Sequence, residues 1–335
     1  MNDGTRQNPP QEAPANWIQR LKRIEFQRYA PLFALLLLGT ISAFLSPYFL
    51  QVQNLVNIFR QVSYTGIIAL GMTLVIISGG IDLSVGSVVA FVGALAILTV
   101  NTPAVQALGA GTAVLLACVV AVGAGFLAGA VNGLLITKGR IAPFIVTLGT
   151  MALFRSLTLY MGNAGEFSSR NALFGDFAAG SFLLLPVPVW VFLILAAFLS
   201  VLLNDTKYGR HLRAVGGNEK VALYSAIDVD RIRFFAYAIN GAMVGISSAL
   251  LASRFNAVSS SNTGLGFELD AIAAVIIGGT AMTGGRGTVW GTVVGAVTLG
   301  VINNMLNMVG ISPYLQGTVK GLVIIAAVYI QRQKN

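Results

Sequence analysis

The chain has 335 residues, of which 56% are hydrophobic and only 10% charged, with a net charge of +9 and a mean hydropathy of +0.78. Soluble domains carry about 25% charged residues. This composition therefore excludes a soluble globular protein, whose apolar surface would aggregate in water. We predict an integral membrane protein, in which ten helices of roughly 20 residues each would leave only short loops.

Individual residue types exclude several kinds of chemistry. The single cysteine, Cys118, permits no disulfide within the chain, and the single histidine, His211, excludes a multi-histidine zinc centre. No lysine follows a glycine, so the sequence has no GxxxxGK phosphate loop, and another chain must hydrolyse any ATP that is used. We expect neither a metal site nor a bound cofactor. The basic residues gather in particular loops, which favours orientation signals in a lipid bilayer over nucleic-acid binding.

Residues 1–30 precede the first long apolar segment. Residues 1–16 are rich in Pro, Asn and Gln, a composition typical of disorder. Over residues 17–28, apolar residues at helical spacing form one side of a helix and basic residues surround the other side. This pattern predicts a short amphipathic helix at the membrane surface. This polar lead is longer than that of a signal peptide, so we expect the apolar segment that follows to be retained.

Ten apolar segments occupy residues 31–330, and we predict that each crosses the membrane as a helix in an all-α, polytopic fold. Their approximate ranges are 31–50, 62–78, 84–100, 111–136, 142–160, 186–203, 232–252, 270–283, 288–306 and 315–330. With both termini in the cytoplasm, the inner loops hold 16 Lys and Arg residues and the outer loops hold 5. This distribution satisfies the positive-inside rule, so we place both termini in the cytoplasm.

Glycines recur every four residues in three of the segments: Gly125, Gly129 and Gly133; Gly241 and Gly245; and Gly287, Gly291 and Gly295. Small residues at this spacing let helix backbones approach closely in lipid. We predict tight packing within the subunit, with a subunit interface as the alternative for one face. Two short acidic matches, at residues 80–83 and 266–270, precede the third and eighth segments and suggest an inverted repeat of five plus five helices.

Asp82 lies between two apolar segments that almost no loop separates. An ionisable side chain at membrane depth costs a few kcal/mol, so it usually has a role or a partner. Two interpretations stay open. Asp82 or Ser84 caps the next helix by accepting hydrogen bonds from its free N–H groups, or both residues belong to a broken helix that lines a solute pathway.

Glu268 and Asp270 form a second acidic site, at the expected outer end of the eighth segment. They either pair with Arg254 or Arg155 as a structural lock, or carry protons as buried carboxylates do in proton-coupled carriers. The sequence does not decide between these two roles.

Asn303, Asn304 and Asn307 lie near the expected outer end of the ninth segment. Amides both donate and accept hydrogen bonds, which suits sugar hydroxyls. They also bond neighbouring helices to one another. A place on a solute pathway and a purely structural role both stay open.

Residues 204–231 form the longest expected cytoplasmic segment. Gly216 and Gly217 allow a sharp turn, and Asn218 can cap a short helix that runs through Ser225. A charged loop is usually just solvated. This helix, however, would have an apolar side, which favours the docking of a cytoplasmic protein. The apolar side comprises Val221, Leu223, Tyr224 and Ile227.

Five stretches of the sequence together resemble one family. They read SGGIDLSVGS at 78–87, GRHLRAVGGN at 209–218, ELDAIAAVIIGGT at 268–280, GGRG at 284–287 and NNMLN at 303–307. In this order they are similar to the membrane permeases of monosaccharide ABC importers, especially the ribose, xylose and galactoside type, over about residues 30–330. One departure is Ala226, where the family usually has glycine in a Ser-Gly-Ile run. We expect a small effect there, a stiffer end of the coupling helix.

The resemblance implies a permease subunit of the bacterial inner membrane that pairs with itself or with a sister permease and breaks no bond itself. An ATPase with two nucleotide-binding domains, which uses ATP and magnesium, would dock on the helix in 204–231, and a periplasmic binding protein would deliver the sugar. The implied ATPase-coupling residues are Gly216, Gly217, Asn218, Glu219, Lys220, Val221 and Tyr224. The candidate path residues are Asp82, Ser84, Glu268, Asp270, Asn303, Asn304 and Asn307.

Two other classes of membrane protein serve as alternatives. An ion-coupled secondary transporter of a small polar solute would work as a lone chain and would depend on Asp82 or Asp270 if these residues carry protons. A multispan enzyme of lipid or glycan metabolism would cluster His, Asp or Arg around a reaction site, and the sequence shows no such cluster.

Overall fold

The computed structural model describes residues 17–332, and within this range the chain forms helices and two very short sheets. The helices are α1 (Trp17–Leu45), α2 (Val52–Ile77), α3 (Val85–Asn101), α4 (Pro103–Gln106), α5 (Ala110–Thr137), α6 (Pro143–Met161), α7 (Ala172–Ala179), α8 (Val187–Asp205), α9 (Lys207–Gly217), α10 (Glu219–Tyr224), α11 (Val229–Phe255), α12 (Phe267–Ile277), α13 (Val289–Met308) and α14 (Pro313–Arg332). The predicted disorder of residues 1–16 falls outside the described residues.

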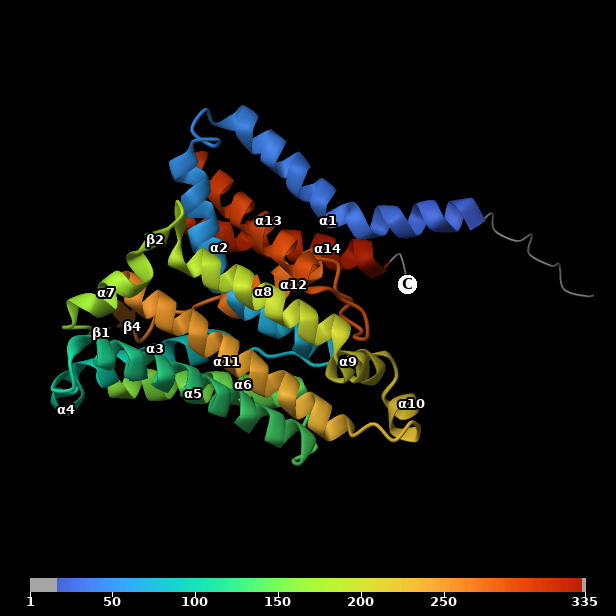
Figure 1. Cartoon of the computed structure of the whole chain (residues 1–335). Coiled ribbons are helices and arrows are strands. Elements are labelled where there is room, and N and C mark those ends of the chain that lie inside the picture. The colour runs from blue at the N-terminus through green and yellow to red at the C-terminus, as the bar shows by residue number, and fades with distance from the viewer. Residues whose placement is uncertain (1–16, 333–335) are drawn as a thin grey trace, which may run out of the picture.

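Six of the helices within residues 17–332 are long and apolar enough to cross a membrane: α2, α5, α6, α8, α11 and α13. The apolar part of α1, Pro31–Leu45, and α3 are shorter apolar helices. Figure 1 shows the long helices side by side along a common direction, with α9 and α10 at one end of the bundle and α7 with the strands at the other. We call these the α10 end and the β4 end. The prediction of an all-helical polytopic membrane protein is confirmed.

The first helix differs from the prediction of two separate elements. The amphipathic segment and the first apolar segment form one helix, α1, which contains Pro31 and changes direction part-way along its length (Figure 1). Proline has no backbone N–H and clashes with the carbonyl four residues earlier, which bends a helix without ending it.

The two sheets lie at the β4 end. Strand β1 (Glu166–Ser168) pairs antiparallel with β4 (Ala257–Ser259), and β2 (Ser181–Phe182) forms a tight hairpin with β3 (Leu185–Pro186). The guanidinium of Arg155 on α6 donates to the carbonyl oxygens of Ser260 and Thr263, each at 3.0 Å. These bonds hold the segment after β4 against α6.

Helices α2 and α11 form the centre of the bundle and are buried along most of their length, whereas only about a third of the residues in the apolar stretches of α5, α6 and α8 are buried. Glycines allow α5 and α11 to touch. A Cβ atom added to Gly125 would overlap the Gly241 carbonyl oxygen, and one added to Gly129 would lie 3.0 Å from the Gly241 Cα atom. The predicted tight packing within the subunit is therefore confirmed for these glycines.

Two short helices, α3 and α12, bring their first turns together inside the bundle. Irregular segments separate α3 from α2 and α12 from α13, so we call α3 and α12 the interrupted helices. The chain leaves α2 at Ile77 and begins α3 only at Val85, and α12 starts after an irregular segment that follows β4. A Cβ atom on Gly86 of α3 would overlap both the Gly264 carbonyl oxygen and the Glu268 carboxylate. The first acidic match, 80–83, thus precedes α3, whereas the second, 266–270, forms the start of α12, and the N-termini of these two short helices meet.

Candidate translocation path and coupling surface

Asp82 lies in a buried polar network that joins three parts of the fold. Its side chain is 2% exposed. One carboxylate oxygen accepts hydrogen bonds from the Ser84 backbone N–H at 2.9 Å and the Ser84 hydroxyl at 2.6 Å, and the other accepts from the Asn240 amide at 2.9 Å. The Asn132 amide donates to the Ser84 hydroxyl at 2.9 Å. Asn132 is on α5 and Asn240 on α11, so both helices hold the segment between α2 and α3.

This geometry differs from a helix cap, which was one of the two interpretations of Asp82 and Ser84 in the sequence analysis. Ser84 occupies the N-cap position of α3, but its side chain accepts no hydrogen bond from the first turn of the helix. Asp82 binds the N–H of Ser84 itself, which fixes the turn before the helix and not the free N–H groups within it. The cap interpretation is therefore wrong. Asp82 and Ser84 lie in the irregular segment between α2 and α3, and their place on a solute path stays a prediction.

Helices α9 and α10 form a hairpin at the α10 end of the bundle (Figure 1). The Asn218 side chain accepts a hydrogen bond from the Val221 N–H at 3.1 Å, so the predicted cap of α10 is confirmed. The expected turn at the two glycines is not where the chain turns, since α9 continues through Gly217 and the backbone becomes extended only at Asn218. This puts Gly216 in a helix.

The outer side of α10 is apolar and exposed. Val221 is 56% exposed, Leu223 55% and Tyr224 90%, whereas Ala222 between them is buried. Lys220 is also exposed. Ile227, which the sequence placed on the same apolar side, instead packs partly buried against the core, because it lies beyond the end of α10.

A close contact between glycines connects the hairpin to the irregular segments that separate α3 from α2 and α12 from α13. We call Gly79, Gly216, Gly284 and Gly285 the glycine junction. A Cβ atom on Gly216 would overlap the Ile77 carbonyl oxygen, and one on Gly284 would lie 3.2 Å from the Gly79 Cα atom. The Gly285 N–H donates to the Ile77 carbonyl at 2.9 Å. Only glycine permits this approach, and Gly79 and Gly285 also have positive φ angles.

Arg233 on α11 adds a charged link at the same place. Its guanidinium is 2.8 Å from the Glu219 carboxylate of α10, and its Nε lies 3.5 Å from the Ser78 carbonyl oxygen at the end of α2. One helical turn further along α11, the Tyr237 hydroxyl donates to the Ile81 carbonyl at 3.0 Å. Arg233 and Tyr237 thus connect α10 and α11 to the segment that carries Asp82. Arg233 was not predicted from the sequence, because its contact with Ser78 joins residues that are 155 positions apart in the chain.

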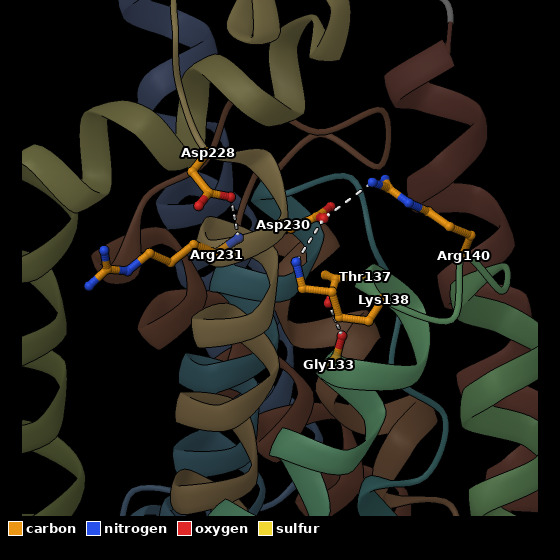
Figure 2. Close-up of polar contacts among 7 residues, drawn as sticks. All are labelled: Gly133, Thr137, Lys138, Arg140, Asp228, Asp230 and Arg231. Atoms are coloured by element: carbon orange, nitrogen blue, oxygen red, sulfur yellow. Dashed lines mark hydrogen bonds and ion pairs between the residues drawn. The ribbon is translucent and has the colours of Figure 1, made fainter.

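The connection between α5 and α6 is attached to the start of α11 (Figure 2). Asp230 accepts from Arg140 at 3.2 Å and lies 3.6 Å from the Lys138 ammonium. Asp228 caps α11 by accepting from the Arg231 N–H at 3.0 Å. Carboxylates suit the positive end of a helix dipole, but ion pairs this exposed contribute little to stability. Their observable effect is to fix which loops meet at the α10 end.

The acidic residues of α12 have different partners. Asp270 forms an ion pair with Lys320 of α14 at 3.0 Å, so the expected pairing of Asp270 with Arg254 or Arg155 is wrong. Glu268 does lie within electrostatic reach of Arg155. The pairing of Asp270 was missed because Lys320 is fifty residues further along the chain.

The three asparagines of α13 occupy three different environments. Asn304 exchanges two amide hydrogen bonds with Asn54 of α2, at 2.8 and 3.1 Å. Asn307 accepts from the Gln316 amide at 2.7 Å. The Asn303 carbonyl oxygen is buried and has no hydrogen-bond partner among the described residues. Asn304 thus joins two helices, as the structural alternative predicted, whereas Asn303 faces a cavity.

A cavity of about 210 Å³ lies between α2, the end of α11, α12 and α13. Among the candidate path residues, Asp270 and Asn303 line it, whereas Asp82, Ser84, Glu268, Asn304 and Asn307 do not. The sequence missed its remaining polar lining, which is Gln61, Tyr64 and Thr65 of α2. Within residues 17–332, no group of three or more His, Cys, Asp and Glu side chains is placed to hold a metal ion.

Comparison with known families finds one family that matches most of the chain. The family described as "Branched-chain amino acid transport system / permease component" matches residues 54–328. The chain belongs to this permease family. Its interrupted helices, cavity and α9–α10 hairpin all lie within the matched region.

Curated relatives of the permease are named as sugar importers. The chain is 42% identical to the ribose import permease protein RbsC of Bacillus subtilis over 94% of this chain and 97% of that protein. It is 37% identical to the D-allose transport system permease protein AlsC of Escherichia coli, over 92% of each chain. It is 35% identical to the galactose/methyl galactoside import permease protein MglC of Escherichia coli, over 90% of this chain and 92% of that one. No solved structure matches.

Proposed function

We propose that the permease is the membrane subunit of an ATP-binding-cassette importer that moves a monosaccharide, a ribose-like pentose or a hexose, across the bacterial inner membrane. The names of its relatives support this class of solute. The single observation that carries the mechanism is the exposed apolar side of α10 on a hairpin that contacts the irregular segments next to both interrupted helices through the glycine junction.

In this proposal the α10 end faces the cytoplasm. The loops and helix ends that meet there hold Lys138, Arg140, the six basic residues from Lys207 to Arg233, and Arg286, as the positive-inside rule requires of a cytoplasmic face. The chain crosses the membrane ten times, with α1, α3, α12 and α14 added to the six long apolar helices. Both termini then lie inside, and 31–330 forms one transmembrane domain that follows the surface helix. The two acidic matches mark the halves of an inverted repeat.

Three partners complete the importer. An ATPase with two nucleotide-binding domains docks on α10, where Val221 and Tyr224 offer apolar contacts and Lys220 a charge. A periplasmic binding protein delivers the sugar at the β4 end, and a second permease copy or a paralogue completes the membrane pair. ATP and magnesium belong to the ATPase, so this chain transmits a conformational change and breaks no bond.

The coupling path runs from α10 to the interrupted helices. When the ATPase closes on ATP, α10 moves, and Glu219 moves Arg233 and the end of α2 with it. The glycine junction passes the same displacement to the segment before α13. Because packed interfaces have discrete arrangements and do not deform continuously, such a shift switches the bundle between inward and outward access.

Co-purification tests the proposal. We would extract the tagged permease gently from its host and identify the accompanying chains by mass spectrometry. A stoichiometric ATPase is the expected result, and an Asn218→Ala variant, which lacks the cap of α10, should recover less of it. Reproducible purification of the permease alone, with uptake by the lone chain in vesicles, would instead place it among secondary transporters. Asp270 argues against that class, because its charge is already paired with Lys320.

A further inference from the structure

Two buried polar atoms without partners line the same cavity. The Tyr64 hydroxyl and the Asn303 carbonyl oxygen are both buried, and neither has a hydrogen-bond partner among the described residues. Buried polar groups in folded proteins are almost always bonded, so each exception needs an explanation. Two exceptions on one cavity of about 210 Å³ indicate a polar occupant that would satisfy them.

The lining has the chemistry of a site for a polyhydroxyl solute. Side-chain amides and hydroxyls both donate and accept, so they match a hydroxyl group whichever way its proton points. Leu299 and the rings of Phe255 and Phe267 provide apolar surface for the C–H face of a sugar ring. The polar side chains that line the cavity are Gln61, Tyr64, Thr65, Asp270 and Asn303.

The charge of the cavity favours a neutral solute. Asp270 is the acidic residue of the lining, and its carboxylate is 3.0 Å from the Lys320 ammonium. A carboxylate that is already paired with an ammonium group is a poor site for a cation but still accepts hydrogen bonds from hydroxyls. We propose that this cavity holds the sugar in transit, with Tyr64 and Asn303 bonding its hydroxyl groups and Asp270 accepting from a third.

This inference rests on the proposed function, and the assay separates the two. The permease, its ATPase and its binding protein are reconstituted in proteoliposomes, and ATP-driven uptake of radiolabelled D-ribose, D-allose and D-galactose is measured. Tyr64→Phe removes one hydroxyl and Asn303→Leu one amide. Each variant should transport about three- to tenfold more slowly, the factor that corresponds to one lost hydrogen bond. Tyr160→Phe is the matched control, because Tyr160 is 82% exposed on α6 and outside the cavity, and it should transport normally.

A second measurement does not depend on the ATPase. Gln61 lines the cavity and is accessible, so Gln61→Cys in a Cys118→Ser background should react with a small thiol reagent in nanodiscs. The transported sugar should slow this reaction at least threefold and leave that of Leu184→Cys unchanged, since Leu184 is 90% exposed between β2 and β3.

The outcomes separate the inference from the function. Absence of protection, together with wild-type transport by Tyr64→Phe and Asn303→Leu, would overturn the inference and leave the proposed function intact. If the wild-type complex transports none of the three sugars, the proposed function fails, and the protection measurement alone then decides whether the cavity binds them.

Discussion

Adding one methyl group to Gly216 should disrupt the connection between the hairpin and the irregular segments next to the interrupted helices. In Gly216→Ala the new Cβ atom would overlap the Ile77 carbonyl oxygen and lie 2.6 Å from the Gly285 nitrogen. These are the two atoms of the Gly285 to Ile77 hydrogen bond, so the methyl group would also break that bond. The backbone on both sides must move, because no flexible side chain is there to yield.

The magnitude follows from two effects. Overpacking of a well-packed contact costs about 1–3 kcal/mol, and the lost hydrogen bond adds about 1 kcal/mol. A total of roughly 2–4 kcal/mol corresponds to a melting temperature lower by about 3–6 °C for a chain of this length. Coupling should suffer as well, so that less sugar moves per ATP hydrolysed.

The neighbouring glycine provides the control. A Cβ atom on Gly217 meets nothing within 4 Å, and alanine is favoured over glycine in a helix by about 0.5–1 kcal/mol. Gly217→Ala should therefore keep or slightly raise the melting temperature. Both variants are purified in the same detergent, and their melting curves and sugar-stimulated ATPase rates are compared. A Gly216→Ala protein that melts and couples like Gly217→Ala would refute the reasoning.

Three further predictions concern two side-chain pairs and one backbone angle. Glu219→Arg places like charges where Glu219 and Arg233 now pair at 2.8 Å. Sugar uptake should fall at least fivefold, while an immunoblot should show an unchanged amount of the permease in the membrane. Adding Arg233→Glu should restore most of the uptake. Asn304→Leu leaves the Asn54 side-chain oxygen without its hydrogen-bond donor and should lower the free energy of unfolding by about 1–3 kcal/mol, whereas adding Asn54→Leu should recover most of the melting temperature. Ala226 has a φ angle of +58°, a conformation that costs an L-residue about 1–2 kcal/mol. Ala226→Gly should therefore raise the melting temperature by about 1–3 °C. An unchanged or lower melting temperature would argue against strain at this position.

Local signals in the sequence predicted much of the fold. The apolar segments became helices, because helices satisfy their own backbone hydrogen bonds in lipid. Asn218 caps α10 as expected, since a cap depends only on the next few residues. The spacing of the glycines in α5 and α11 predicted close helix packing, because residues four apart lie on the same helix face.

Contacts between distant helices could not be predicted in the same way. Asn303, Asn304 and Asn307 belong to one motif, yet one faces a cavity, one bonds α2 and one bonds α14. Their roles depend on how α13 is rotated and how far it is shifted along its neighbours, which no local pattern records. For the same reason Gly216 suggested a turn, whereas its actual role is the close approach of another backbone.

The central claim is that this chain moves a sugar only when a separate ATPase drives it. The most direct measurement is uptake of radiolabelled D-ribose, D-allose and D-galactose into proteoliposomes that contain the permease, with and without its ATPase, binding protein and ATP. We predict uptake of at least one sugar only when all components and ATP are present. Uptake by the permease alone, driven by an ion gradient and insensitive to ATP, would contradict the account.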